Sequence, residues 1–447
     1  MNTSTLGYPK AGVAWATTFY LALLYWLAVL DRYIISLLVD PIKEDLGITD
    51  VQFGLLHGFA FAITYAGFGL FAGFLADRFS RRWVIFASVS IWSLATAACG
   101  LVNNFWQMMV ARIGVGFGEA GLNPCAVSII SDLHPKKSLT RAMAVYLVGA
   151  SIGSGCAYLL GGLLVEYVSR FDTVVFPVLG ELRSWQAAFV YVGIPGVLLG
   201  IPMLLIKEPE RRGSLAARGE ALTQTFLGSY AKLLRYLLEH KYYLYHFLGF
   251  GFPAFVVIAG SAWYPAHMSR TFDWSPAEIG ASLGLMTLLS SALGKVICGV
   301  VVDWLYARGY KDAHLRFYAY GMLCSMPFGI IGMISTTPWV FFSCMGFFML
   351  FVAMLAVVSN TAMSMVTPNE LRGTTVAFFS ATTGMVAMTA GPVLVAMFSR
   401  IFFNDESIGS GIAVLIGICI PLSAGFLIRG MPLFKQAVID AELRDGG

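Results

Sequence analysis

Long apolar stretches alternate with short polar breaks along the whole sequence. A helix that crosses the hydrocarbon core of a bilayer needs about 20 apolar residues, and each stretch is long enough to do so. We therefore expect an all-α membrane protein with twelve transmembrane helices. In the first half of the chain they lie at residues 14–39, 50–76, 83–101, 105–131, 139–167 and 185–206, and in the second half at 242–268, 277–305, 315–335, 338–366, 371–398 and 408–431.

The composition supports this pattern and excludes several other classes. Of 447 residues, 58% are hydrophobic and 12% are charged, whereas a soluble domain carries about 25% charged residues. A water-soluble, disordered or collagen-like chain is therefore excluded. The seven cysteines lie in apolar stretches without a pairing pattern, and we interpret them as small buried residues. We expect no catalytic residue, no metal ligand and no cofactor.

The distribution of positive charge predicts the orientation. If the amino terminus is inside, 21 of the 29 Lys and Arg residues fall in inside loops and tails, five fall outside and three lie within spans. Positive residues are concentrated on the cytoplasmic side of membrane proteins. We therefore expect both termini in the cytoplasm, in a multi-pass protein of a bacterial inner (plasma) membrane.

The second half of the sequence repeats features of the first. Residues 49–54 match residues 275–280 at an offset of 226, and the same offset relates Asp77 to Asp303. Both matched segments have the spacing of a capping box, a motif that is found where a helix begins. Several matches in the same order indicate two parallel six-helix halves, an arrangement that forms substrate sites near the membrane midplane.

The repeat and the charged breaks divide the chain into four parts. We expect an N-terminal six-helix bundle at 1–206 and a C-terminal six-helix bundle at 242–431, followed by a cytoplasmic tail at 432–447. The charged segment 207–241 is expected to be a cytoplasmic linker. Its later part has the pattern of an interfacial amphipathic helix, although an ordinary solvated helix fits equally well.

The loop after the second span has a polar motif, Gly73-Phe-Leu-Ala-Asp77-Arg78-Phe-Ser-Arg81-Arg82. Its arginines can bridge to carboxylates and to carbonyl groups at helix ends. These contacts would form a latch that is closed in one conformation of the protein and broken in the other. An ordinary turn with cytoplasmic arginines is the alternative. We expect a cytoplasmic gate made of Gly73, Asp77, Arg78, Arg81, Arg82, Asp132 and, through the repeat, Asp303.

This motif, the six-plus-six repeat and the basic linker resemble the major facilitator superfamily. Within that superfamily, two segments resemble the Spinster branch: Asp31-Arg32-Tyr33 in the first span and Arg112-x-Gly114-x-Gly116-x-Gly118-Glu119-Ala120 in the fourth. The resemblance implies the major facilitator fold and transport activity. It also implies an amphipathic lipid-like substrate, such as a lysophospholipid or a sphingoid phosphate.

Four charged residues in the first half lie deep within predicted spans. A charge at the bilayer centre costs about 3 kcal/mol, so it needs a partner. Asp31 and Arg32 face about 100° apart on one helix and must pair with other helices. We hypothesise that Asp31 and Glu119 exchange protons while Arg32 and Arg112 act as counter-ions or hold an anionic substrate. A static ion-pair network is the alternative.

The second half has only one deep charge, Lys295. Lys295 can attract an anionic group, or its side chain can extend to the membrane surface. The surrounding second-half spans are rich in Phe and Met, which would accept an apolar tail. We therefore expect a small amphipathic or anionic substrate.

The function that these features favour is proton-coupled secondary active transport by alternating access. Transport of small organic anions, sugars or drugs is the alternative. A membrane-embedded lipid-modifying enzyme is disfavoured because the sequence has no catalytic His-Asp or Ser-His cluster, and a channel fits the repeat poorly. The expected partners are protons, the substrate and the lipid bilayer, without nucleic acid, and we expect a monomer.

Overall fold

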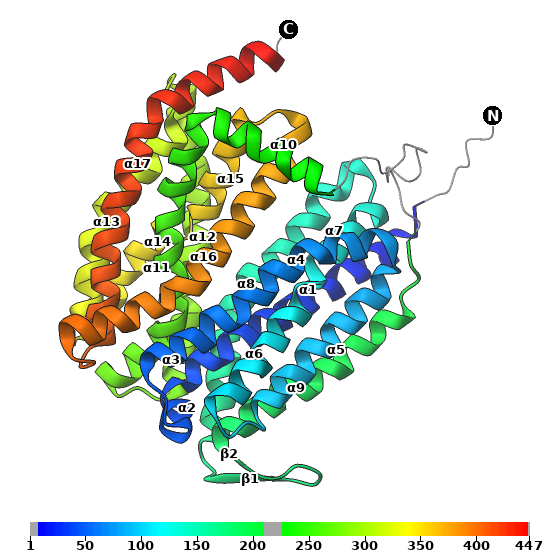
Figure 1. Ribbon diagram of the computed structural model, residues 1–447, viewed down its shortest axis with the longest axis vertical. Helices are drawn as coiled ribbons and strands as arrows, with labels where there is room; N and C mark the ends of the chain where they lie inside the picture. Colours follow the sequence, from blue (N-terminus) through cyan, green and yellow to red (C-terminus); the bar gives the residue numbers. More distant parts are fainter. Residues whose placement is uncertain (1–7, 210–225, 446–447) are drawn as a thin grey trace. The chain divides into compact units, whose positions relative to one another are not determined.

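The computed structural model describes residues 8–209 and 226–445, and most of them are helical (Figure 1). Within these ranges, twelve helical segments are long and apolar enough to cross a membrane, from Ala11–Leu46 to Ile408–Leu443. They coincide with the twelve spans that the hydropathy pattern predicts. The predicted helical membrane architecture is therefore confirmed.

The elements of the first half follow the spans, and the first, second and fourth spans are interrupted. The α-helices are α1 (Ala11–Ile34), α2 (Val39–Leu46), α3 (Asp50–Gly54), α4 (Ala60–Arg78), α5 (Arg81–Cys99), α6 (Phe105–Glu119), α7 (Leu122–Leu133), α8 (Lys136–Val168) and α9 (Ser184–Gly200). Shorter helical segments are η1 (Ile35–Leu38), η2 (Leu55–Phe59) and η3 (Ile201–Leu205), of which η2 is a π-helical turn. The second half contains α10 (Phe226–Glu239), α11 (Lys241–Phe272), α12 (Pro276–Ala307), α13 (Ala313–Ile334), α14 (Pro338–Val352), α15 (Leu355–Val366), α16 (Asn369–Phe403) and α17 (Ile408–Asp445).

A short β-hairpin lies between α8 and α9. Its strands, β1 (Thr173–Phe176) and β2 (Gly180–Arg183), pair antiparallel, with Val174 opposite Leu182. The all-helical prediction misses this hairpin because four-residue strands are too short to produce a clear alternating pattern.

The chain forms two compact units. The first comprises Met1–Leu222 and Ser275–Gly284, and the second comprises Thr223–Trp274 and Leu285–Gly447. In the first unit, α1 packs on α8, and α5 packs on both α6 and α9. In the second unit, α17 packs on α11 and α13, while α16 packs on α11. The last helix continues through most of the segment expected to be a tail.

Two features of the sequence repeat reappear in the structure. Thr49 and Gln52 form the predicted capping box, in which each side chain bonds the other residue's backbone N–H. Ser275 and Glu278 form the same pair of bonds, at 2.9 and 3.4 Å. The fourth and tenth spans are also broken at corresponding places, because α6 ends at Glu119 and α14 ends at Val352. The repeat therefore extends to irregularities inside the spans.

Candidate functional site

Glycines on α6 allow its backbone to lie directly against neighbouring helices. A Cβ atom at Gly118 would lie 2.5 Å from the backbone nitrogen of Trp92 on α5, and one at Gly116 would lie 2.4 Å from a carbonyl oxygen of α4. No larger side chain fits at these distances. The close packing places Arg112 and Glu119 of the same helix in the interior, where both are buried.

Arg32 of α1 forms an ion pair with Glu119 of α6, in the interior of the first unit. The Glu119 side chain is 1% exposed and the Arg32 side chain is 24% exposed. The guanidinium carbon also lies 4.7 Å from the ring centre of Phe61 and 5.1 Å from that of Tyr65. A carboxylate and two aromatic faces therefore hold this cation.

Asp31 faces a different direction from Arg32 and is 1% exposed. Trp92 and Thr96 lie beside its carboxylate as hydrogen-bond donors, but neither makes a well-aligned hydrogen bond to it. Arg112 and Glu119 are close enough to act on it electrostatically. A buried polar atom without a partner is costly, so this carboxyl group needs a proton, a water molecule or a ligand.

Arg112 is in a similar situation. Its Nε atom and one of its Nη atoms are buried, and no described residue accepts a hydrogen bond from them. We refer to Asp31, Arg32, Arg112 and Glu119 as the charged cluster. The structure thus brings together all four charges that the sequence places deep in the first-half spans.

The π-helical turn η2 adds His57 to this region. Its side chain is 6% exposed, its Nδ1 atom has no partner within the described ranges, and Arg112 and Arg32 act on it electrostatically. Such turns occur often at functional sites because they change the direction of a side chain within a helix. Sequence reasoning favours a packing role for His57, since no pattern of residues reveals a π-helical turn.

A chain of polar aromatic contacts leads from the charged cluster to α7 and α8. The Tyr146 hydroxyl donates a hydrogen bond to Asn123, whose amide nitrogen lies 3.5 Å from the Tyr65 hydroxyl. The rings of Tyr25 and Tyr146 stack at 5.1 Å. These residues belong to four helices, α1, α4, α7 and α8, and become neighbours only when those helices pack together.

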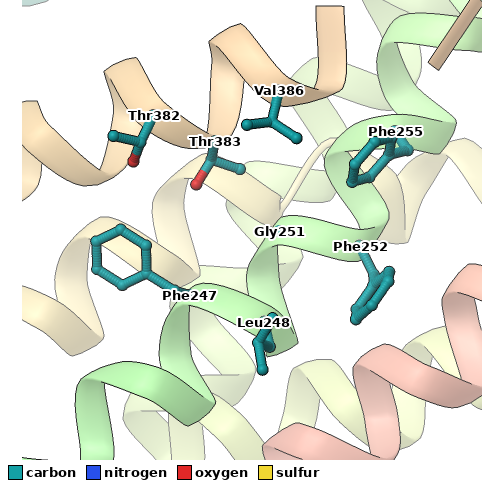
Figure 2. Close-up of a pocket in the computed structure, with 8 residues that line it drawn as sticks. All are labelled: Phe247, Leu248, Gly251, Phe252, Phe255, Thr382, Thr383 and Val386. Atoms are coloured by element: carbon teal, nitrogen blue, oxygen red, sulfur yellow. The ribbon is translucent and has the colours of Figure 1, made fainter. Parts of the chain in front are cut away.

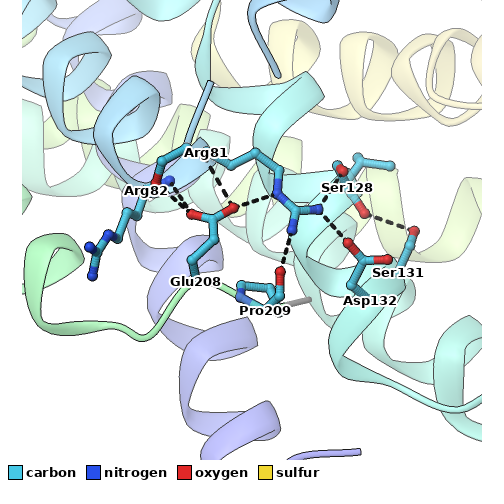
Figure 3. A network of polar contacts seen from close by, with 9 residues as sticks. Arg81, Arg82, Ser128, Ser131, Asp132, Glu208 and Pro209 are labelled. Atoms are coloured by element: carbon cyan, nitrogen blue, oxygen red, sulfur yellow. Dashed lines mark hydrogen bonds and ion pairs between the residues drawn. The ribbon is translucent and has the colours of Figure 1, made fainter. Parts of the chain in front are cut away.

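A second polar cluster surrounds Arg81, at the start of α5 (Figure 3). This arginine is fully buried. Its Nε atom donates to Glu208 at 2.8 Å, and one Nη atom donates to Asp132 and to Ser128, the latter at 2.7 Å. The other Nη atom donates to the Pro209 carbonyl oxygen at 2.8 Å. We call these five residues the Arg81 cluster.

Glu208 also caps the first turn of α5. Its carboxylate accepts the backbone N–H groups of Arg81 and Arg82, at 3.2 and 3.1 Å, and the Ser80 hydroxyl at 2.8 Å. Burial alone would raise the pKa of Glu208, but the hydrogen bonds from Arg81, Arg82 and Ser80 outweigh it and hold that pKa below its ordinary value. Sequence reasoning missed Glu208, although a carboxylate just after the sixth span was a visible signal.

The other gate residues expected in the first unit behave differently. The guanidinium of Arg82 reaches the Ile206 carbonyl oxygen at 3.4 Å, and its Nε atom has no partner in residues 8–209 or 226–445. Arg78 is exposed at the end of α4. The surroundings of Gly73 and the side chain of Asp77 lie outside what the structure describes. The observed contacts of this loop therefore centre on Arg81.

Lys295 and Asp303 both belong to α12, in the part of that helix that lies in the second unit. The Lys295 side chain is partly buried. Asp303 is exposed, forms no ion pair with a described residue, and acts electrostatically on His314. The arginine-centred arrangement of the first unit is therefore not reproduced around Asp303.

An apolar cavity of about 300 Å³ opens between α11 and α16 of the second unit (Figure 2). It is lined by Phe247, Leu248, Gly251, Phe252, Phe255, Thr382, Thr383 and Val386. The Thr382 hydroxyl is occupied, since it donates to the Phe378 carbonyl oxygen of its own helix at 2.7 Å. The cavity therefore offers hydrocarbon surface with little hydrogen-bonding demand. Among the described residues, no group of His, Cys, Asp and Glu could hold a metal ion.

Comparison with known proteins defines the family. The Major Facilitator Superfamily model matches residues 21–392. An MFS-type efflux pump of Mycolicibacterium smegmatis is 30% identical over 298 residues, which is 66% of this chain and 64% of the relative. The sphingosine-1-phosphate transporter SPNS2 of Mus musculus is 24% identical over 389 residues, or 83% of this chain and 67% of the relative.

A solved structure shares the whole fold. It is a bacterial homolog of the human lysosomal transporter Spinster, in an inward-facing and unoccupied conformation. The TM-score is 0.78 and the identity is 23%, and the match covers 98% of this chain and 99% of the other. The chain spans between 49% and 68% of the length of the curated relatives compared with it.

The chain therefore belongs to the major facilitator superfamily, a family of multi-pass membrane transporters. Within it, the chain is a member of the Spinster branch, as the residues around Asp31 and Glu119 suggest.

Proposed function

We propose that this protein is a secondary active transporter that works by alternating access and is coupled to protons. The observation that carries the proposal is the ion pair between Arg32 and the buried Glu119, beside the buried carboxyl group of Asp31, which forms no ion pair with a described residue. Carboxylates buried within a membrane span are costly and are commonly used as proton carriers. The family membership and the transporters among the relatives support the same activity.

The charged cluster suggests how protons are coupled. While Glu119 is ionised, its charge compensates that of Arg32. Protonation of Glu119 would leave the partly buried Arg32 without a counter-ion, which is unfavourable. Arg32 would then need another anion, which an anionic group of the substrate can supply. Proton uptake and substrate binding would thereby change the charge balance together, and the two states of the cluster would favour different conformations.

The substrate that fits best is an amphipathic lipid-like anion, such as a lysophospholipid or a sphingoid phosphate. The apolar cavity of the second unit suits a hydrocarbon tail. In the first unit, considered by itself, the guanidinium groups of the buried Arg112 and the partly buried Arg32 suit a phosphate or carboxylate, which accepts two parallel hydrogen bonds from arginine. A relative that transports sphingosine-1-phosphate supports this choice. Transport of a drug or a small organic anion is the second candidate, favoured by the similarity to an efflux pump.

The Arg81 cluster is the best candidate for a cytoplasmic latch. Asp132 of α7 and the segment after α9 are both held to the start of α5 through this one arginine. A conformational change that separates these elements would have to break several charge-assisted hydrogen bonds. Lys and Arg are concentrated in the same loops, which supports a cytoplasmic location for them and for both termini in a plasma membrane.

Transport in proteoliposomes under an imposed pH gradient tests the proton coupling. We expect the wild-type protein to accumulate substrate only when the gradient is present, and we expect Glu119→Gln and Asp31→Asn to lose that dependence. Glu406→Gln, at an exposed residue outside the spans, is the matched control. If folded Glu119→Gln and Asp31→Asn variants keep full gradient dependence, these carboxylates do not couple protons.

A ligand-stabilisation screen on purified protein tests the substrate class separately. The ligands should include lysophospholipids, sphingoid phosphates, organic acids, sugars and drugs. We expect the midpoint of thermal unfolding to rise with the lipid-like anions. A rise with sugars alone would exclude a lipid-like substrate without affecting the proton-coupling result.

A further inference from the structure

A second pocket, distinct from the apolar cavity, lies at one end of the second unit between α10, α11 and α17. Its volume is about 180 Å³. Aromatic and charged side chains line it, including Tyr236, His240, Lys241, Tyr243, Gln436 and Asp440. Nothing in the proposed transport mechanism uses these residues, so their combination requires its own explanation.

One wall of this pocket is aromatic. The ring of Tyr236 lies 4.4 Å from that of His240 and 5.7 Å from that of Tyr243. Hydrogen bonds hold two of these rings in place: His240 Nδ1 pairs with the Tyr236 carbonyl oxygen at 2.8 Å, and the Tyr243 hydroxyl pairs with Thr367 at 2.8 Å. A fixed group of aromatic faces is a favourable environment for an ammonium group.

The charges in the pocket are of both signs. Asp440 supplies a carboxylate that accepts a hydrogen bond from Gln436 at 2.8 Å. Lys241, on the neighbouring helix, supplies an ammonium group. Neither charge is engaged in an ion pair with another described residue. A ligand that carries one negative and one positive group would satisfy both.

The position of the pocket residues along the membrane-crossing segments indicates the source of such a ligand. Lys241 begins the seventh membrane-crossing segment, and Asp440 lies three residues before the end of the last one at Leu443. Lys241 is therefore at the start of a span, where lipid headgroups lie, and Asp440 lines the same pocket as Lys241. On α10, Leu234 and Leu238 are 43% and 83% exposed and share one face of the helix. A surface helix with exposed leucines next to a membrane span is typical of one that lies in the bilayer interface.

We propose that this pocket binds the headgroup of a zwitterionic phospholipid from the surrounding bilayer. Lys241 pairs with the phosphate. The ammonium group lies against the rings of Tyr236 and His240 and pairs with Asp440. The exposed leucines of α10 lie among the acyl chains, so that the bound lipid fastens α10 to the membrane.

Native mass spectrometry of the purified full-length protein tests this site. Phosphatidylethanolamine, phosphatidylglycerol and soluble phosphorylethanolamine are titrated separately. We expect the wild-type protein to bind phosphatidylethanolamine more tightly than phosphatidylglycerol, because only the former carries an ammonium group. Asp440→Asn should weaken phosphatidylethanolamine binding about tenfold, as expected for the loss of a charge-assisted hydrogen bond, and Asp440→Glu should restore it. Lys241→Gln should weaken both lipids.

The matched control for Lys241→Gln is Lys435→Gln, at an exposed residue of α17 that does not line the pocket. Equal binding of the two lipids by the wild-type protein would overturn the proposal, and this comparison needs no variant to fold. Binding of soluble phosphorylethanolamine as tightly as the intact lipid would also overturn it, because the pocket would then serve a soluble ligand.

Discussion

Arg32 on the first span and Glu119 on the fourth form an ion pair in the interior of one six-helix unit, although 87 residues separate them. Both are charges that a bilayer-spanning segment tolerates only with a partner. Their pairing explains why each can be present. Arg32 Nε and Glu119 Oε1 still have no hydrogen-bond partner among the described residues, and neither do both oxygens of Asp31 and two nitrogens of Arg112.

The Arg32–Glu119 pair predicts a specific pattern of stability in detergent. Glu119→Gln leaves the Arg32 charge uncompensated, so we expect the protein to lose about 3 kcal/mol of stability. Arg32→Gln should have a similar effect. The double variant should recover part of the loss, with a coupling energy of about 1–3 kcal/mol. Thermal unfolding of the four proteins measures this energy, and strictly additive effects would show that the two side chains do not interact.

Packing at Gly118 predicts a steric requirement. Gly118→Val would place a branched side chain against the backbone of Trp92 and should lower stability by at least about 2 kcal/mol and abolish transport. Gly67→Ala is the control, because a Cβ atom there has nothing within 4 Å. Expression yield, gel-filtration profile and unfolding midpoint report the effect. A Gly118→Val protein as stable as Gly67→Ala would contradict the packing.

The hydrogen bonds of Glu208 predict a pH dependence. Because they hold its pKa below the ordinary value of 4.5, the stabilisation by the ionised carboxylate is complete above pH 4.5 and is lost as the pH falls through the lower folded-state pKa. Glu208→Gln should therefore be less stable than wild type at pH 7, and the difference should shrink at lower pH. Unfolding midpoints between pH 7 and 3.5 test this, with Glu406→Gln as control. A difference that stays constant with pH would refute the assignment.

The apolar cavity of the second unit predicts a variant that separates substrate binding from folding. Gly251 lines this cavity, and the nearest atom to a Cβ placed there is 3.9 Å away, on Thr383. Gly251→Leu should fill the cavity without disturbing the fold and should reduce stabilisation by lipid-like anions about tenfold in apparent affinity. Gly425→Leu, at a glycine with open space around it, is the control. Unchanged ligand stabilisation in Gly251→Leu would place the hydrocarbon tail elsewhere.

Local properties of the sequence were sufficient to predict several features correctly. Twelve spans follow from runs of apolar residues, because a helix in lipid must satisfy its own backbone and cover it with apolar side chains. The capping boxes at Thr49 and Ser275 follow from spacing within one turn. The deep charges Asp31, Arg32, Arg112 and Glu119 could be identified as important from their depth alone, since any charge in a span is costly.

Only the tertiary structure decided which charged side chains pair with one another. The sequence left open whether Arg32 or Arg112 would pair with Glu119, because the rotation of each helix depends on how its neighbours pack. Glu208 became a cap for α5 through a contact across 127 residues, and the π-helical turn around His57 has no periodicity that could reveal it. The pattern of apolar residues is a property of one segment, so the sequence determined it. An ion pair or a cavity is a property of several packed segments, so only the fold decided it.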